Sequence, residues 1–201
     1  MLSHERRLWA DGYERVAGLD EAGRGCLAGP VVAAAVIMPP QVEITTIQDS
    51  KALSEAQRLD ARATIEEQAV AAAIAACSPA EIDERNILQA ALKAMRRAAA
   101  ECQPSPDFVL VDGNQWDRNL VDAPWPHETV VKGDAKSQSI AAASILAKTE
   151  RDAFMRDLHE EHPEYDWASN VGYPTQQHYD ALREHGVTPH HRESFTLFRD
   201  G

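Results

Sequence analysis

Five short apolar runs are spread along the chain, with polar or mixed segments between them. Residues 31–38, VVAAAVIM, are apolar on both faces of an extended chain, which predicts a strand inside a covered sheet. Pro39 and Pro40 follow this run and end it, because proline donates no hydrogen bond to a neighbouring strand. The predicted strands are Val16–Asp20, Val31–Met38, Val70–Cys77, Phe108–Asp112 and Thr129–Val131.

The run Val70–Cys77 has two interpretations. Its alanines could continue the preceding helix, since alanine has the highest helix propensity. A strand is favoured, because Ser78 and Pro79 behind the run are typical of a new helix start and Glu81 completes a capping box.

The segments between the strands carry helical periodicity and capping residues. Ser54 and Gln57 form a second capping box, whereas Thr175 and Gly186 mark the start and end of the last helix. The predicted helices run from Ser54 to about Glu67, over Pro79–Arg85, Asn86–Glu101 and Ser139–His159, and from Thr175 to about His185. Residues 1–15 are interpreted as a loose arm or a short helix. Strands that alternate with helices predict one α/β domain.

Composition and charge narrow the function classes. The chain has 201 residues, of which 44% are hydrophobic, and this is enough for one compact domain with a sizeable core. The formal net charge is −12, from 20 Lys and Arg against 32 Asp and Glu. This charge argues against a protein that coats nucleic acid through bulk basicity. An enzyme that holds a polyanion locally, through metal ions and a few cations, remains open.

The cysteines and the N-terminus bear on location. Cys26, Cys77 and Cys102 are widely spaced and form no C-x-x-C pair, which favours a reducing compartment over a disulfide framework or a zinc site. The first residues, MLSHERRLWADGYER, lack the apolar core of a secretory signal, and no apolar run approaches the length of a membrane span. We expect a cytoplasmic protein that does not enter membranes.

The stretch Val16–Pro30, VAGLDEAGRGCLAGP, combines candidate chemistry with a flexible backbone. Asp20 and Glu21 end an apolar run, and three closely spaced glycines follow them with Arg24 between the first two. Such glycines allow a close approach to a bulky ligand, and the arginine suggests that the ligand is anionic. By pattern alone, a charged turn between two strands is about as good an interpretation as a functional loop.

Two later strand ends also carry acids. Asp112 follows FVLV and precedes Gly113, and Asp134 lies beyond the short strand near residue 130. If these strands are neighbours and point the same way, Asp20, Glu21 and the two later acids converge on one edge of the sheet. Converging carboxylates repel one another, and a pair of Mg²⁺ or Mn²⁺ ions relieves this repulsion. Two such ions about 3.5–4 Å apart can activate water for phosphodiester cleavage. For any single acid, mere solvent exposure is the simpler interpretation.

The order of several motifs then resembles the bacterial ribonuclease HII family over about residues 16–195. The motifs are GLDEAGRGCLAGPVVAAAV, DSKALSE, EIDERNIL, FVLVDGN, VVKGDAKSQSIAAASILAKTERD and GYPT. The resemblance implies a single ribonuclease H-like domain over residues 1–201. Its mixed five-stranded sheet would be flanked by helices, with an N-terminal arm over 1–15 and a helical C-terminal segment over about 163–201.

The resemblance also implies a function and its residues. Members of the family are metal-dependent endonucleases that cut the RNA strand of RNA–DNA hybrids and single ribonucleotides in duplex DNA, leaving 3′-hydroxyl and 5′-phosphate ends. Their four metal-binding acids correspond to Asp20, Glu21, Asp112 and Asp134, and their substrate-binding residues to Gly23, Arg24, Gly25 and Tyr173, with Lys51 and Asn86 as further nucleic-acid contacts. A monomer that binds these nucleic acids is expected. For Lys51 a solvated loop, and for Asn86 a helix N-cap, are equally good interpretations.

Other interpretations remain open. The enzyme alternative is a DEDD-type exonuclease of the same fold, and a second alternative is a nucleic-acid-binding module without activity. Lys148 and Arg151 could add cationic surface, but the solvent-exposed face of a charged helix is the more usual interpretation. The run His190-His191-Arg192 offers no obvious third metal ligand, so contact with substrate or packing of the tail is favoured.

Overall fold

The computed structural model describes residues 1–40, 42–47, 53–116 and 123–198. Its centre is a mixed sheet of five strands in the order β3-β2-β1-β4-β5. The bounds are β1 (Val16–Ala22), β2 (Val31–Ile37), β3 (Ala71–Cys77), β4 (Phe108–Asp112) and β5 (His127–Val130). Strands β1, β2 and β3 pair antiparallel, whereas β1, β4 and β5 are parallel to one another. The predicted strands are confirmed, including the ambiguous one at β3.

Three of the predicted helices begin at the capping residues that the sequence indicates, and the helix predicted over Ser139–His159 runs from Gln138 to Glu161. Ser54 and Ser78 each form a complete capping box, and Thr175 accepts a hydrogen bond from the backbone N–H of His178. The bounds are α1 (Ser3–Ala10), α2 (Glu55–Gln68), α3 (Pro79–Arg85), α4 (Ile87–Glu101), α6 (Gln138–Glu161), α7 (Trp167–Asn170) and α8 (Gln176–His185). No helix in the described part of the chain combines the length and apolarity that a membrane crossing requires.

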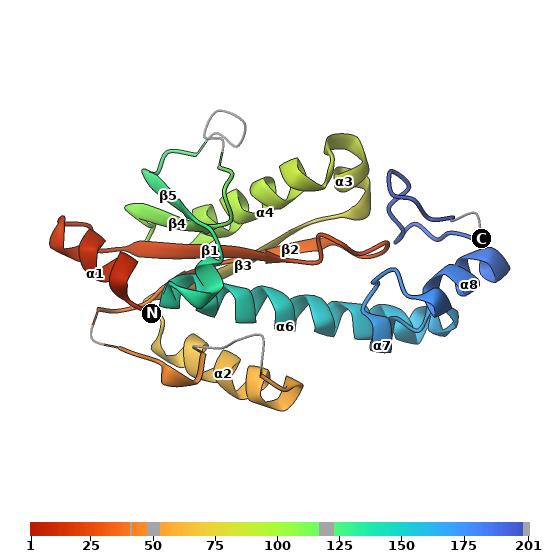
Figure 1. Ribbon diagram of the computed structural model, residues 1–201, viewed down its shortest axis with the longest axis horizontal. Coiled ribbons are helices and arrows are strands. Elements are labelled where there is room, and N and C mark those ends of the chain that lie inside the picture. Colours follow the sequence, from red (N-terminus) through yellow and green to blue (C-terminus); the bar gives the residue numbers. More distant parts are fainter. Residues whose placement is uncertain (41, 48–52, 117–122, 199–201) are drawn as a thin grey trace.

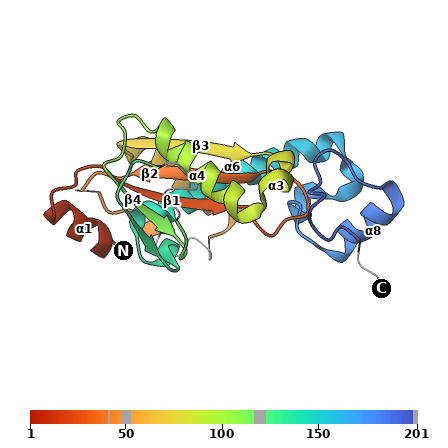
Figure 2. The same cartoon turned by 90° about the horizontal axis from the view of Figure 1, so that it is seen from above.

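The sheet lies between two helical layers. Figure 1 shows α4 above the sheet and α6 below it, with α2 on the far side of α6, and Figure 2 shows α3 and α4 over the strands. Ala17 and Leu19 of β1 pack in the cluster that contains α4, whereas Ala34 and Val36 of β2 pack with α6. All seven residues of β2 are buried, as the continuous apolar run predicted.

The N-terminal segment is a packed helix rather than a loose arm. Glu5 of α1 is fully buried, and its Oε1 accepts hydrogen bonds from Ser137 Oγ at 2.6 Å and from the Ser139 N–H at 3.0 Å. The carboxylate thereby sits at the N-terminus of α6, where the helix dipole favours negative charge. This contact fixes the start of the helix that supports β1.

The C-terminal residues gather at one end of the molecule, beyond the loop that joins β1 to β2 (Figure 1). The Leu27 N–H donates to Gly172 O and the Gly29 N–H donates to His190 O, both at 2.8 Å. The helical C-terminal segment implied by the family resemblance is therefore confirmed as part of the fold. It packs directly against the loop of residues 23–30 between β1 and β2, which we call the glycine loop.

Candidate active site

The three parallel strands bring the four predicted acids to one edge of the sheet. Asp20 and Glu21 lie near the end of β1, and Asp112 is the last residue of its neighbour β4. Asp134 follows β5 in a 3₁₀ turn. Parallel neighbours have their carboxyl ends at the same edge, which is where ligands of open α/β sheets bind. The condition for convergence is met, and metal binding by these acids stays a prediction.

Asp20 is buried and faces α6. Its side chain is 7% exposed, and Ser144 of α6 hydrogen-bonds to it. Burial, followed by the negative charges of Glu21 and Asp112, raises the pKa of Asp20 well above its ordinary value. A bound cation would therefore strongly stabilise the ionised form of Asp20.

Glu21 lies beside the other acids and also pairs with Arg24 of the glycine loop. The Arg24 Nη1 donates to Glu21 Oε1 at 3.1 Å, whereas Glu21 Oε2 is buried and has no hydrogen-bond partner among the described residues. Burial is the main cause that raises the pKa of Glu21, the charge of Asp112 adds to it, and Arg24 opposes it. An unpaired buried carboxylate oxygen beside two further acids matches the all-oxygen ligand set that Mg²⁺ and Mn²⁺ prefer.

Asp112 and Asp134 are linked through one backbone group. The Gly133 N–H donates to Asp112 Oδ1 at 2.6 Å, so the turn that carries Asp134 is fixed to the end of β4. Asp134 is 6% exposed. Glu21 and Asp112 also line a cavity of about 110 Å³ against α4.

A larger cavity of about 440 Å³ opens beside Glu21. The Gly23-Arg24-Gly25 loop and Tyr173 form part of its lining. A side chain at Gly25 would meet the Tyr173 ring at 3.8 Å, so loop and ring are adjacent, and the Tyr173 side chain is 44% exposed. The structure therefore brings together the residues that the resemblance assigned to the substrate. Their contact with nucleic acid stays a prediction.

Arg151 corrects one sequence interpretation. Its side chain is 1% exposed rather than solvated, and it donates to three carbonyl oxygens, Pro30 O and Ala28 O at 3.0 Å and Val171 O at 2.8 Å. The reason is that loop carbonyls inside the protein need donors, and a guanidinium supplies several at once. Gly23 has a φ of +93°, and a Cβ there would lie 2.0 Å from Arg151 Nε. The glycine loop is thus shaped around this buried arginine.

Three further residues line the larger cavity, and the sequence singled out only Lys148 among them, as added cationic surface. They are Ser144 and Lys148 of α6 and Arg58 of α2. The Lys148 Nζ donates to Asp152 Oδ1 at 2.6 Å. Residues 144, 148 and 151 share one helix face by their spacing, which was the available signal. Arg58, Lys148 and Arg24 therefore place three positive charges along the cavity of an acidic protein.

The predicted nucleic-acid contacts of Lys51 and Asn86 have different outcomes. Lys51 lies outside the described residues. Asn86 caps α4, since its Oδ1 accepts from the Gln89 N–H at 3.1 Å, so the N-cap interpretation is confirmed. A contact between Asn86 and nucleic acid stays a prediction.

The His190-His191-Arg192 run packs the C-terminal tail against the rest of the protein, which is one of the two interpretations favoured from the sequence. His191 Nε2 lies 3.2 Å from His178 Nε2 in a buried pair. Arg192 is fully buried and donates to Gly29 O at 3.0 Å and to Arg24 O at 3.1 Å. Two buried arginines, Arg151 and Arg192, therefore hold the carbonyls of the glycine loop.

Comparisons with known proteins bear on the family and the fold of the chain. The family model described as Ribonuclease HII matches residues 17–198. The chain is 92% identical to Ribonuclease HII of Salinibacter ruber over 200 residues, which cover 100% of both chains. The crystal structure of ribonuclease H2 from Pyrococcus horikoshii OT3 matches with a TM-score of 0.77 and 25% identity, covering 91% of this chain and 94% of that one. Bst-RNase HIII in complex with Mn²⁺ shares the fold, with a TM-score of 0.72 and 16% identity, over 91% of this chain and 67% of that one.

Proposed function

Because the chain belongs to the ribonuclease HII family and is a ribonuclease H, we propose that it cuts both long RNA–DNA hybrids and single ribonucleotides within duplex DNA. Cleavage is endonucleolytic and falls on the 5′ side of the ribonucleotide. Water is added to the phosphorus, and the products end in a 3′-hydroxyl and a 5′-phosphate. The observation that carries the proposal is that neighbouring parallel strands bring the four acids to one sheet edge, where one of them, Glu21, lines the same cavity as the glycine loop and Tyr173.

Divalent cations complete the proposed site. Asp20, Glu21, Asp112 and Asp134 would hold Mg²⁺ or Mn²⁺, and the raised pKa of Asp20 together with the unpaired Glu21 Oε2 supports this set. Such ions supply an activated water and stabilise the charge that develops on the phosphate oxygens. The Mn²⁺ complex of Bst-RNase HIII, a protein of the same fold, is consistent with this chemistry.

The chain's own groups orient the substrate. Arg24 is bound to Glu21 yet its side chain is 51% exposed, so its guanidinium remains available to a phosphate next to the acids. Backbone groups of Gly23 and Gly25 can approach the 2′-hydroxyl, which is the group that distinguishes RNA from DNA. Arg58 and Lys148 add positive charge along the same cavity. These few local cations bind the polyanion although the net charge is −12.

A covalently closed circular duplex with one embedded ribonucleotide tests the proposal. We expect the protein to nick the circle when Mn²⁺ or Mg²⁺ is present and to leave it intact in EDTA. A circle without the ribonucleotide is the matched control and should remain closed. An exonuclease has no end to start from on this substrate, and a binding module would retard the circle in a gel without nicking it. A circle that stays closed in the presence of metal, whether or not the protein retards it in a gel, would contradict the proposal.

Tyr173 gives a second prediction, on the choice of cleavage site. The Tyr173→Ala variant should cut an embedded ribonucleotide roughly tenfold or more slowly, because stacking on one base or sugar contributes about 1–3 kcal/mol. The Tyr173→Phe variant keeps the ring and should lose a smaller factor, since one hydrogen bond contributes about 0.5–1.5 kcal/mol.

Single-turnover rates on an embedded ribonucleotide and on a long hybrid measure this effect. Tyr13→Phe is a suitable control, because Tyr13 packs against Phe108, on the side of the sheet near α1. The partly exposed Tyr173 ring should be removable without unfolding. Wild-type rates in both Tyr173 variants would show that the tyrosine does not contribute to substrate recognition.

A further inference from the structure

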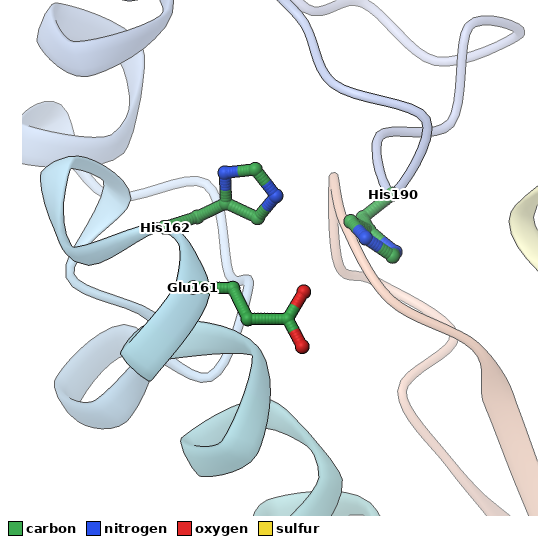
Figure 3. Close-up of side chains that lie close together, drawn as sticks. All are labelled: Glu161, His162 and His190. Atoms are coloured by element: carbon green, nitrogen blue, oxygen red, sulfur yellow. The ribbon is translucent and has the colours of Figure 1, made fainter.

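A second group of metal-binding side chains lies at the end of α6, away from the four acids. Glu161 is the last residue of α6, His162 caps the helix, and the tail brings His190 beside them. The potential ligand atoms of these three residues all lie within 4.8 Å of one another. Figure 3 shows the Glu161 carboxylate and both imidazole rings around the same space. The structure thus provides His190 with the partners that the sequence did not reveal.

The donor types indicate which ion would fit. Two imidazole nitrogens and one carboxylate oxygen suit Zn²⁺ and similar divalent transition metals, whereas Mg²⁺ prefers oxygen ligands throughout. Zn–N and Zn–O bonds of about 2.0–2.2 Å require the donor atoms to close further, and the exposed Glu161 side chain is free to rotate for this. Three protein ligands leave one position for water.

The surroundings of His162 support the same interpretation. Its Nδ1 lies 3.5 Å from Glu164 Oε1, and a carboxylate in this position orients an imidazole for metal binding through the other nitrogen. The His162 ring packs edge-on against Tyr165 and Trp167, with ring centroids at 6.3 and 5.7 Å.

We propose that Glu161, His162 and His190 bind one divalent transition-metal ion of the zinc class. The ion fastens the tail to the end of α6. His190 O accepts the Gly29 N–H at 2.8 Å, and Arg192 two residues further on holds Arg24 O. Metal binding would therefore stabilise the position of the glycine loop, from a site that is separate from the four acids.

Titration with Co²⁺ tests the site by a readout that does not involve activity. Metal-free protein is first given excess Mg²⁺, which occupies oxygen-ligand sites and competes weakly for imidazole. We expect one equivalent of Co²⁺ to bind with the visible absorption of a low-coordinate nitrogen and oxygen site. Zn²⁺ should displace it and, at about 100 times its Kd, raise the Tm by about 5 °C or more.

Four variants make the assignment specific. Glu161→Gln and His190→Gln should each weaken Co²⁺ binding by at least about tenfold, since even loss of a group that orients a ligand has that effect. The double variant His162→Gln/His190→Gln should lose the absorption. His185→Gln is the matched control, because His185 is exposed beside Glu184 on α8 and belongs to no such group among the described residues.

The same experiment can overturn the proposal. Co²⁺ binding that persists unchanged in the double variant would place the ion elsewhere, and absence of any Co²⁺ binding in the wild type at about 100 µM would show that no such site exists. Circular dichroism of the metal-free variants checks that they fold. Should His190→Gln fail to fold, Glu161→Gln decides, because its exposed side chain is not needed for packing.

Discussion

Asp20→Asn should lower the rate of hybrid hydrolysis at least about 10³-fold while hybrid binding is largely retained. The substitution keeps the shape of the side chain and the possibility of a bond to Ser144, but it removes the charge that would hold a divalent ion. Several kcal/mol of transition-state stabilisation depend on that ion, and about 1.4 kcal/mol corresponds to a tenfold change in rate. Single-turnover cleavage with saturating enzyme measures the loss, and gel retardation in Ca²⁺ or EDTA measures binding.

The same variant should be as stable as the wild type or more stable when no divalent ion is present. Burial, Glu21 and Asp112 raise the pKa of Asp20 in the folded state, so ionised Asp20 opposes folding. For a raised carboxyl pKa, the stability contribution is greatest below the unfolded pKa and decreases as pH rises toward the folded pKa. Asparagine removes this penalty at neutral pH. Adding Mn²⁺ should raise the Tm of the wild type more than that of the variant.

These two readouts separate catalysis from structure. Asp180→Asn is the control, since Asp180 is exposed on α8 and pairs with Arg183 in the same helix, and it should change neither activity nor the response to Mn²⁺. An active Asp20→Asn enzyme would remove Asp20 from the catalytic group. An inactive variant with a markedly lower Tm would instead mean that the residue serves folding.

Gly18→Ala should destabilise the protein by about 3 kcal/mol or more, at or beyond the upper end for overpacked cores. Gly18 lies in β1 against the first turn of α6, and a Cβ there would be 2.1 Å from Ser139 C and 2.2 Å from Ile140 N. These are backbone atoms, and the α6 start is fixed by Glu5, so neither side can yield cheaply. For a chain of this size the change corresponds to a Tm lower by roughly 6–12 °C.

Differential scanning calorimetry without metal measures the Gly18→Ala effect. Gly25→Ala is a matched control for stability alone, since among the described residues a Cβ at Gly25 meets only the Tyr173 ring, at 3.8 Å. It should leave the Tm within about 2 °C, because substitutions that disturb no packing change stability by about 0.5 kcal/mol or less. A Tm for Gly18→Ala equal to that of the control would mean that α6 can move away from β1.

Much of the fold could be predicted from the sequence because its signals are local. The capping boxes at Ser54 and Ser78 act through hydrogen bonds within one turn, and both form as predicted. The apolar run of β2 indicates its own burial on both faces. The acids at three strand ends needed only one further condition, that the strands be parallel neighbours, and the family resemblance supplied the rest.

Contacts between distant segments could not be predicted in this way. Arg151 has the same kind of charged neighbours on α6 as a solvated residue, and only the position of the β1–β2 loop over it turns it into a buried donor to Ala28 O and Pro30 O. His190 likewise meets Glu161 only because the tail returns to the end of α6.

By itself, the sequence determined the strands and the capped helix starts, since each depends on residues a few positions apart, and together with the family resemblance it indicated the candidate acids. The tertiary structure decided what surrounds Asp20, which arginines hold the glycine loop and which side chains gather around His190. The physical reason is that burial and charge pairing join residues about 120 positions apart, as for Arg151 and Pro30, and local patterns carry no record of such contacts.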